Sequence, residues 1–372
     1  MSETTQKTWN ETPLRELHER AGARIGAWFG CALPDHFSGA DWLAEYRAAR
    51  ESVALIDKNY RAYLRLTGPD RVRYLNAILT NNIKDLAAGR GIVSLFLNPQ
   101  GRIQAEIETY TEADSLFCVS YAMIRERLIE SLDKYIIMDD VTLADETHRF
   151  ATLALEGPQA AAAVQELSGA DIISLPELAS TDASVDSIPC RIVKRSPAGV
   201  AGAEFIVQEE NLAALWQVLL DATRKQGGSP VGYSALSAIR LAQGVPWFGY
   251  DFGEKQIPHE AGLQDTHISY TKGCYTGQEI VERVRSRGQV NRQRTGLIFD
   301  GDTVPDAGTT LFLDAKELGY VTRAARIWDP HRVIGMGYVR KEGSVPGTIL
   351  HWAGGTATPA HFPEALRTII EA

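Results

Sequence analysis

Two stretches of the chain share one pattern of apolar and polar residues. In residues 62–79 (AYLRLTGPDRVRYLNAIL), apolar residues first alternate with polar ones, a Gly-Pro pair follows at Gly68, and apolar residues then recur at helical spacing. Residues 150–167 (FATLALEGPQAAAAVQEL) repeat this order, with the Gly-Pro pair at Gly157. Alternation is typical of a strand, and proline suits the first turn of a helix. The pattern therefore predicts two related α+β halves.

Residues 92–110 lie between the two copies and have the pattern of a β-hairpin. Residues 98–101 are of types common in turns, and they lie between two strand-like runs. On the second strand, one face is apolar and the other is polar. The apolar face comprises Ile103, Ala105 and Ile107, and the polar face comprises Arg102, Gln104, Glu106 and Glu108. Apolar residues at helical spacing over 124–136 predict a helix after the hairpin.

The last third of the chain changes character twice. Residues 236–263 begin as a helix and then break at four Gly and Pro residues among Trp247, Phe248 and Tyr250. Such a segment predicts an ordered loop that lines a cavity. From about Arg294 onward, short apolar runs separated by Gly and Pro predict a small antiparallel β domain.

Composition limits the class of protein. A chain of 372 residues has room for two or three domains, and its formal net charge of -9 argues against a nucleic-acid surface covering the whole molecule. The polar N-terminus and the lack of a long apolar run predict a cytoplasmic protein without a membrane span. The four cysteines are dispersed, so neither a disulfide framework nor a zinc site is expected.

Common catalytic motifs are missing, and the eight histidines show no metal-ligand spacing. What remains is a set of polar groups in Gly-rich loops, including Glu204, Arg240 and Tyr250. A buried carboxylate can accept paired N–H donors from a heterocycle such as a pterin, and a guanidinium can bind a carbonyl or carboxylate. The alternative for Glu204 and Arg240 is a structural ion pair or simple solvation.

The segment KGCYTGQE (residues 272–279) places the Cys274 thiol beside Lys272. A nearby cation or helix N-terminus lowers the pKa of a thiol, and a helix starting at Thr276 with Glu279 in a capping box would supply such a terminus. The alternative is a small buried side chain at a tight turn after Gly273. Five arginines follow between residues 283 and 294, and they could attract a polyanionic ligand tail or an acidic partner.

These residues resemble a known family. KGCYTGQE is similar to the signature of the YgfZ-type folate-binding proteins, within the larger glycine-cleavage T-protein superfamily. Residues 13–30, 74–83, 239–251 and 258–263 also resemble segments of that superfamily, so the likeness covers almost the whole chain.

The resemblance implies an α+β fold in which two related α+β domains and a C-terminal antiparallel β-barrel form a ring around a central folate cavity. The expected domains are residues 1–61 with 150–284, residues 62–149, and residues 285–372. Glu204 would hold the pterin of tetrahydrofolate, with Arg240 and Tyr250 lining the site. Beside Cys274, the distinctive loop would comprise Lys272, Gly273, Tyr275, Thr276, Gly277, Gln278 and Glu279.

Several positions depart from the T-protein pattern. The GGxxDD motif, whose first Asp acts in the one-carbon transfer, reads GRIQAE here, with Ala105 and Glu106 at the two Asp positions. The TND motif ends in Asn82, and a folate-facing Tyr is replaced by Pro197, while Glu204 is kept. By this resemblance the folate pocket is retained, whereas the aminomethyl-transfer machinery is dismantled.

The main hypothesis is a monomeric tetrahydrofolate-binding auxiliary protein that supports iron–sulfur cluster assembly or repair in client enzymes. Cys274 would be its functional thiol, and the cluster would belong to the client protein. The alternative is an active folate-dependent aminomethyl- or methyltransferase in which Glu106 replaces the missing Asp. A second alternative is a scaffold that keeps the fold and binds no ligand.

Overall fold

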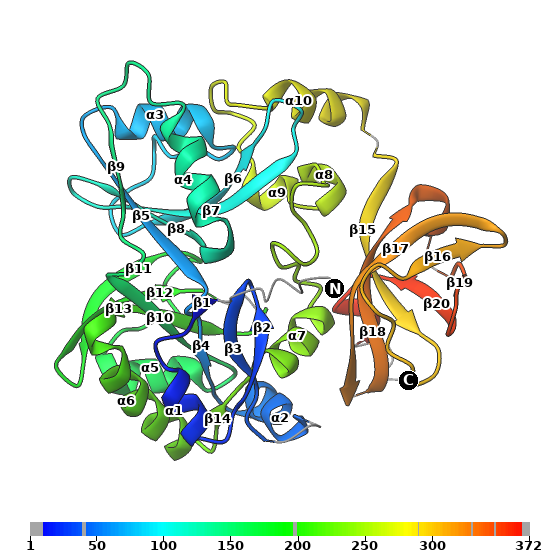
Figure 1. The fold of residues 1–372 in the computed structure, drawn as a ribbon, viewed down its shortest axis with the longest axis horizontal. Helices are drawn as coiled ribbons and strands as arrows, with labels where there is room; N and C mark the ends of the chain where they lie inside the picture. The colour runs from blue at the N-terminus through cyan, green and yellow to red at the C-terminus, as the bar shows by residue number, and fades with distance from the viewer. Residues whose placement is uncertain are drawn as a thin grey trace, which may run out of the picture.

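The computed structural model describes residues 10–38, 42–195, 199–288, 290–328, 330–345 and 347–366. Two mixed α+β parts and a β-barrel lie around the middle of the molecule in Figure 1. The predicted α+β fold with a C-terminal antiparallel barrel is therefore confirmed. The substitution expected at Pro197 lies outside the described residues.

A six-stranded sheet forms the core of the first α+β part, in the order β11-β12-β13-β10-β4-β14. Its strands are β4 (Ala54–Asp57), β10 (Phe150–Glu156), β11 (Ser180–Val185), β12 (Ile188–Lys194), β13 (Gly202–Gln208) and β14 (Ser229–Pro230). Helices α5 (Ala160–Ser168) and α6 (Leu212–Lys225) pack against β10 and β13. Apolar residues from these elements form one buried cluster, which includes Leu155, Val164 and Leu219.

The second α+β part has a five-stranded sheet in the order β6-β7-β8-β5-β9. Its strands are β5 (Arg61–Thr67), β6 (Gly91–Leu97), β7 (Ile103–Thr111), β8 (Leu116–Tyr121) and β9 (Thr142–Asp145), and its helices are α3 (Arg71–Ile78) and α4 (Arg125–Asp133). The predicted hairpin is β6–β7, with Gly101 at φ 70° in its turn. The predicted helix over 124–136 ends at Asp133.

The predicted repeat is present as β5–α3 and β10–α5. Gly68 and Gly157 occupy equivalent turns, with φ of 97° and 127°. A Cβ on Gly68 would lie 2.2 Å from the carbonyl oxygen of Asp140, and one on Gly157 would lie 2.4 Å from that of Ser52. Both turns therefore require glycine, because of backbone conformation and because another backbone segment approaches closely.

The N-terminal residues and the segment between the sheets and the barrel complete the structure. Three strands form a small sheet, β1 (Asn10–Glu11), β2 (Arg24–Trp28) and β3 (Cys31–His36), beside helices α1 (Arg15–Arg20) and α2 (Leu43–Glu51). After the buried helix α7 (Tyr233–Ala242) come the short helices α8 (Pro258–Ala261) and α9 (Gln264–His267), and then α10 (Gln278–Arg287). This segment contacts the five-stranded part, since the amide of Ser269 donates to the carbonyl of Thr80 at 3.0 Å.

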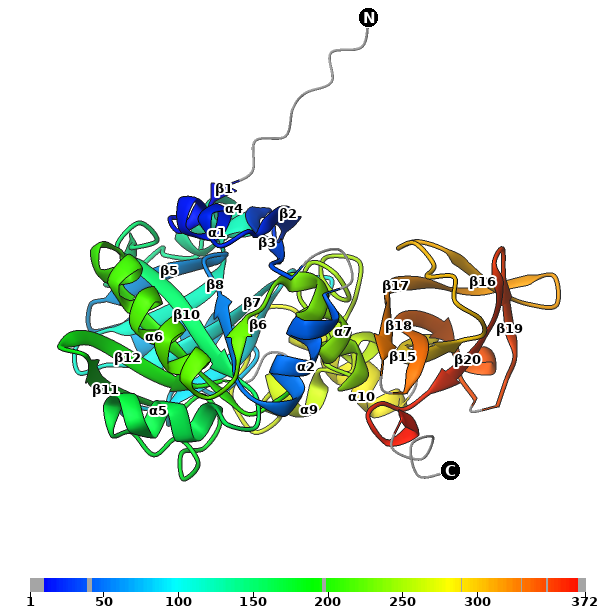
Figure 2. The same cartoon turned by 90° about the horizontal axis from the view of Figure 1, so that it is seen from below.

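The C-terminal part is a closed antiparallel barrel in the order β15-β18-β17-β16-β19-β20. Its strands are β15 (Arg292–Phe299), β16 (Thr310–Leu313), β17 (Lys316–Trp328), β18 (His331–Arg340), β19 (Leu350–Trp352) and β20 (Gly355–Ala360). It has its own apolar cluster, including Leu297, Val321 and Val339, and Figure 2 shows it beside the two sheets. The expected domain boundaries stay a prediction.

Candidate functional site

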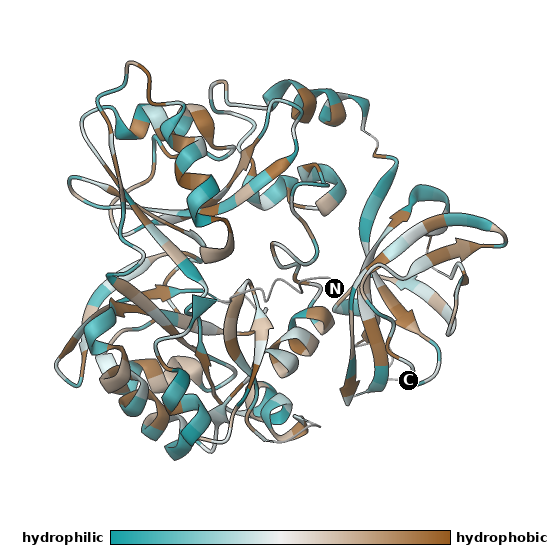
Figure 3. Ribbon diagram, viewed as in Figure 1, coloured by the Kyte–Doolittle hydropathy of each residue, from teal (hydrophilic) through white to brown (hydrophobic). Residues whose placement is uncertain are grey.

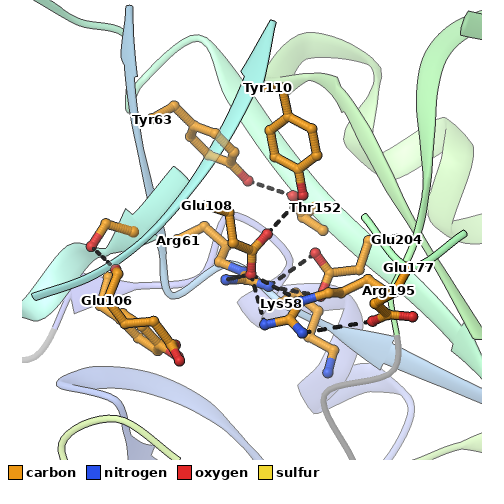
Figure 4. A network of polar contacts seen from close by, with 12 residues as sticks. Lys58, Arg61, Tyr63, Glu106, Glu108, Tyr110, Thr152, Glu177, Arg195 and Glu204 are labelled. Carbon is orange, nitrogen blue, oxygen red and sulfur yellow. Dashed lines mark hydrogen bonds and ion pairs between the residues drawn. The ribbon is translucent and has the colours of Figure 1, made fainter. Parts of the chain in front are cut away.

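A buried network of charged side chains lies between the two sheets (Figure 4). Arg61, the first residue of β5, donates to both oxygens of Glu204 on β13, at 2.8 and 3.0 Å. Its other terminal nitrogen donates to Glu108 on β7 at 3.2 Å. All three residues are at most 4% exposed. The network therefore joins the two α+β parts through one arginine.

Two further ion pairs extend this network. Arg195 lies 3.0 Å from Glu108, and Lys58 lies 2.9 Å from Glu156. Burial by itself raises the pKa of Glu108, but the charges of Arg195 and Arg61 outweigh it and hold the pKa at about 2. Burial raises the pKa of Glu156 above its usual value, because Lys58 offsets the desolvation only in part.

The network determines what Glu204 can do. Its carboxylate is 2% exposed, and both oxygens accept from Arg61. A pterin could reach this carboxylate only if Arg61 moved away. The role of Glu204 as a pterin ligand therefore stays a prediction that requires a rearrangement.

Arg240 on α7 also lies in a buried ion pair, but its partner is Asp251 rather than Glu204. Asp251 accepts a second bond from the hydroxyl of Thr322 on β17 at 2.6 Å, so the pair links α7 to the barrel. The guanidinium carbon lies 4.8 Å from the centre of the Trp247 ring. Nε and Nη2 of Arg240 have no hydrogen-bond partner within the described part of the chain. Because Arg240 is fully buried, its role in lining a folate site stays a prediction.

A cavity of about 760 Å³ lies beside this ion pair. Its walls include Tyr250 and Asp251 from the loop after α7, and Tyr320 and Thr322 from β17. Phe248 and Phe252 add further aromatic surface. The Gly- and Pro-rich loop thus lines a cavity, as its sequence predicts, and Tyr250 is the predicted folate residue that faces this cavity.

Glu106 on β7 forms a buried polar cluster with Tyr121 and His267, which lie far from it in the sequence. Its carboxylate accepts from the Tyr121 hydroxyl at 2.7 Å and lies 3.0 Å from Nε2 of His267, at the end of α9. Burial alone raises the pKa of Glu106, but the hydrogen bonds and charges around it lower the pKa below its usual value. Sequence reasoning missed His267, because no motif or spacing connects it to a residue 161 positions away.

Lys272 anchors the KGCYTGQE segment to the end of helix α3. Its ammonium group donates to the carbonyl oxygens of Asn76, Leu79 and Asn81. These carbonyls lie at the negative end of the helix dipole, where a cation is stabilising. Burial lowers the pKa of Lys272 to about 8, while the three acceptors favour the ammonium form. The geometry indicates an anchoring role for Lys272, and its influence on the Cys274 thiol stays a prediction.

Cys274 is exposed, whereas Cys31, Cys118 and Cys190 are buried. Burial raises the pKa of these three thiols to about 12, 12 and 11, respectively. Cys274 is therefore the cysteine that solvent-borne partners can reach, and its alternative role as a small buried side chain is wrong.

The segment after Cys274 differs from the prediction. Helix α10 begins at Gln278 instead of Thr276, and no capping box forms, because Gly277 occupies the cap position with φ 81°. Glu279 instead pairs with Arg283 at 2.6 Å. A Cβ on Gly277 would lie 2.7 Å from the carbonyl oxygen of Asn98, so this glycine lets the segment pack on the β6–β7 turn. The expected tight turn at Gly273 is absent, since the turn in this segment lies at Thr276 and Gly277.

The remaining signature residues lie around this anchor. The Tyr275 ring is buried, with the ammonium of Lys272 5.1 Å from its centre. Thr276 is partly buried, and Gln278 is the first residue of α10.

The described residues contain no cluster of three or more His, Cys, Asp or Glu side chains that could hold a metal ion. In the same residues, no helix has the length and apolar character that crossing a membrane requires.

Comparison with known families gives a match over most of the chain. Residues 14–270 match the family model described as the GCVT N-terminal domain. The chain belongs to this family. The matched range covers both α+β parts and ends just before the KGCYTGQE segment.

Other proteins of similar length resemble the chain. The aminomethyltransferase of Rubrobacter xylanophilus is 27% identical over 90% of this chain and 88% of its own length. The aminomethyltransferase of Herpetosiphon aurantiacus is 29% identical over 84% of this chain and 85% of its own length. The crystal structure of the glycine cleavage system aminomethyltransferase T from Bartonella henselae superposes with a TM-score of 0.86 at 24% identity, over 96% of this chain and 98% of that one. This structural likeness shows that the fold is shared.

These relatives bear on the two main hypotheses. Membership of the GCVT family supports the wider superfamily assignment but does not separate its YgfZ-type members from its transferases. The relatives' names favour the aminomethyltransferase alternative over the iron–sulfur hypothesis. Against this, Ala105 is 1% exposed and carries no group that could exchange a proton.

Proposed function

We propose that the protein binds a reduced folate and acts as an auxiliary factor for iron–sulfur enzymes, with Cys274 as its functional thiol. The observation that carries this proposal is the exposure of Cys274 on a segment anchored by Lys272. Such an arrangement presents one thiol at a fixed place on the surface, which suits contact with a client protein.

Support for folate comes from the aromatic cavity. Its volume of about 760 Å³ is within the range of small-molecule sites. Tyr250 and Tyr320 supply flat apolar surface for a pterin or benzoyl ring, and Asp251, the partner of Arg240, lies in the same wall. The residues present therefore fit tetrahydrofolate. When bound, tetrahydrofolate would supply the carrier atoms for a one-carbon unit.

Binding is tested by anaerobic calorimetric titration of tetrahydrofolate. The wild type should bind saturably, and Tyr250→Ala should weaken binding by about tenfold or more, because the ring is lost. Tyr135→Ala, which truncates a tyrosine that does not line this cavity, is the matched control. Glu204→Gln keeps the side-chain volume and removes the charge. Weaker tetrahydrofolate binding by this variant would indicate that Arg61 moves away and that the Glu204 carboxylate contacts the pterin. No binding to folded wild-type protein would leave the scaffold alternative.

The role of the thiol is tested in a strain that lacks the gene. Wild-type protein should restore the activity of iron–sulfur enzymes, and Cys274→Ala should not. Cys190→Ala is the control, because that thiol is buried on β12. Full restoration by Cys274→Ala would contradict the proposal.

The second candidate is a folate-dependent aminomethyltransferase, which the names of the relatives favour. Glu106 is the carboxylate that would act, since it neighbours Ala105 on β7. The test is formation of methylenetetrahydrofolate from tetrahydrofolate and an aminomethyl-loaded lipoyl carrier. Product above background that disappears in Glu106→Gln would establish this function in place of the first.

A further inference from the structure

Three large apolar side chains are exposed on one short loop, residues 134–141, which joins α4 to β9. Tyr135, Ile137 and Met138 are 38%, 82% and 91% exposed, and Figure 3 shows the hydrophobic tip of this loop in brown. Single exposed apolar residues are common on protein surfaces, but a cluster of them marks an interaction surface. The other large apolar residues that are exposed in the described part of the chain are scattered, namely Met123, Ile173, Val304, Val345 and Ile349.

The 134–141 loop is held in place, so the exposure of its apolar residues is a fixed feature. Ile136 packs against the main buried cluster. The amide of Asp140 donates to the carboxylate of Asp70, just before α3, at 2.9 Å. Arg73 of α3 pairs with Asp139 at 2.7 Å. A surface that is already ordered loses little conformational entropy on binding, which favours its use as an interface.

Helix α3 also connects this loop to the KGCYTGQE segment. The Tyr135 ring packs edge-to-face on Phe96, with ring centres 6.1 Å apart, and Phe96 forms a backbone bridge with Leu79. The carbonyl of Leu79 in turn accepts from the Lys272 ammonium. In Figure 1 the loop after α4 and the segment before α10 both lie beside α3.

The size of α3 places the loop and the thiol within reach of one partner. The eight residues of this helix span about 12 Å. One side of a standard protein interface covers about 800 Å², which is a disc about 30 Å across. A single partner can therefore cover both the 134–141 loop and Cys274.

Unpaired negative charge surrounds the loop. Residues 130–141 carry four carboxylates and one lysine. Glu130, Asp133 and Asp140 are exposed and form no ion pair within the ranges that the structure describes. On the other side of Cys274, the first two arginines of α10 already pair with carboxylates of the same helix. The surface that complements the loop is therefore apolar with cations at its border, because opposite charges steer association and suppress wrong partners.

We propose that the 134–141 loop is the docking surface for the protein that reaches Cys274, and that this partner presents an apolar segment bordered by lysine or arginine. The inference rests on the proposed role of Cys274 as a functional thiol. Ile137 and Met138 are the anchors, because a few side chains at the centre of an interface carry most of its binding energy. Docking there raises the effective concentration of the partner at the thiol.

The first experiment separates docking from the reactivity of the thiol. Ile137→Ser/Met138→Ser removes the apolar surface without adding charge, and Ile173→Ser, which truncates a distant isoleucine that is 75% exposed, is the matched control. In the strain that lacks the gene, the double variant should restore at most about a tenth of the iron–sulfur enzyme activity that the wild type restores. The control should restore all of it. The small reagent dithionitrobenzoate should modify Cys274 at the same rate in all three purified proteins.

The second experiment tests the chemistry of the partner with two synthetic peptides. Each carries the same apolar residues, a Gly/Ser linker of about six residues that reaches about 20 Å, and one cysteine as its mixed disulfide with thionitrobenzoate. Lysines border the apolar residues in one peptide, and glutamates border them in the other. Cys274 attacks the cysteine sulfur of the peptide, so a disulfide forms between them and thionitrobenzoate leaves with the electron pair of the broken S–S bond. The released product reports Cys274 alone, because the other three thiols are buried.

The lysine peptide should react with the wild type at least tenfold faster than the glutamate peptide, and Ile137→Ser/Met138→Ser should remove most of this gain. Equal rates for the two peptides, a gain that survives in the double variant, or full restoration by that variant overturns the inference while the role of Cys274 stands. If the wild type itself restores no iron–sulfur enzyme activity, the proposed function fails, and the peptide rates then decide the inference alone. A wild-type dimer in sedimentation velocity that the double variant loses assigns the loop to a second copy of the chain and overturns its assignment to a client.

Discussion

Replacing Lys272 by methionine tests whether this lysine is the anchor of the KGCYTGQE segment. The substitution keeps an unbranched chain of similar length but removes the ammonium group. The carbonyls of Asn76, Leu79 and Asn81 then lose a shared charged donor at the end of α3. These carbonyls belong to the end of α3 and to the turn that follows it, where no N–H group of the helix is available as a donor.

The size of the effect follows from these contacts. A hydrogen bond to a charged group contributes about 1.5–3 kcal/mol net, and a cation at a helix C-terminus contributes about 0.3–1 kcal/mol. The three bonds share one ammonium, and its removal also relieves the cost of burying a charge, so their contributions are not additive. We expect the free energy of local opening to fall by about 3 kcal/mol, which corresponds to roughly 100-fold faster hydrogen exchange.

Hydrogen-exchange mass spectrometry on peptides covering residues 74–83 and 270–281 measures this change. Lys84→Met is the control, because Lys84 is exposed near the same helix and its ammonium has no hydrogen-bond or ion-pair partner in the described part of the chain. Peptides from the barrel should exchange as in the wild type. If hydrogen exchange in these peptides is less than about threefold faster in Lys272→Met, the anchoring role is refuted.

Three other predictions concern single sites. The pKa of Glu108 is about 2 in the folded state, below the value of about 4.3 expected after unfolding. Its contribution to stability is therefore complete above about pH 5 and is lost as pH falls toward 2. Glu108→Gln should flatten the acid limb of a profile of stability against pH, measured by tryptophan fluorescence. A thiol reagent should titrate one cysteine in the native protein and four after denaturation, and the native signal should vanish in Cys274→Ser. Gly277→Ala should destabilise by about 2 kcal/mol or more in thermal unfolding, because it adds a clash to backbone strain, whereas Gly288→Ala meets strain without a clash and should cost less.

Local sequence patterns predicted the elements whose stability is local. The strand, Gly-Pro turn and helix recur at β5–α3 and β10–α5 because alternation, proline and helical spacing act over a few residues. The barrel was predicted for the same reason. The start of α10 was predicted two residues early, because Gly277 adopts the left-handed conformation needed to pack on Asn98, and no local pattern records that contact.

The polar site was less predictable, because its partners are far apart in the chain. Arg61 and Glu204 are separated by 143 positions, and the Lys272 ammonium reaches a carbonyl 196 positions away. The sequence identified Glu204 and Arg240 as notable residues and left open an ion pair between them. Only the packing of the sheets and the barrel shows that each pairs with a different residue.

Glu106 shows how this long-range packing bears on the choice between the two functions. A proton-transfer base must take up a proton near neutral pH, and each unit by which its pKa falls makes that uptake less favourable by about 1.4 kcal/mol. In this structure, Tyr121 and His267 both contact the ionised carboxylate, and its pKa is lowered. A transferase that relied on Glu106 would first have to break these contacts, whereas Cys274 is already exposed to solvent. The two contacts that hold Glu106 therefore weigh against its taking over from the missing Asp, and they favour the proposed role centred on the thiol.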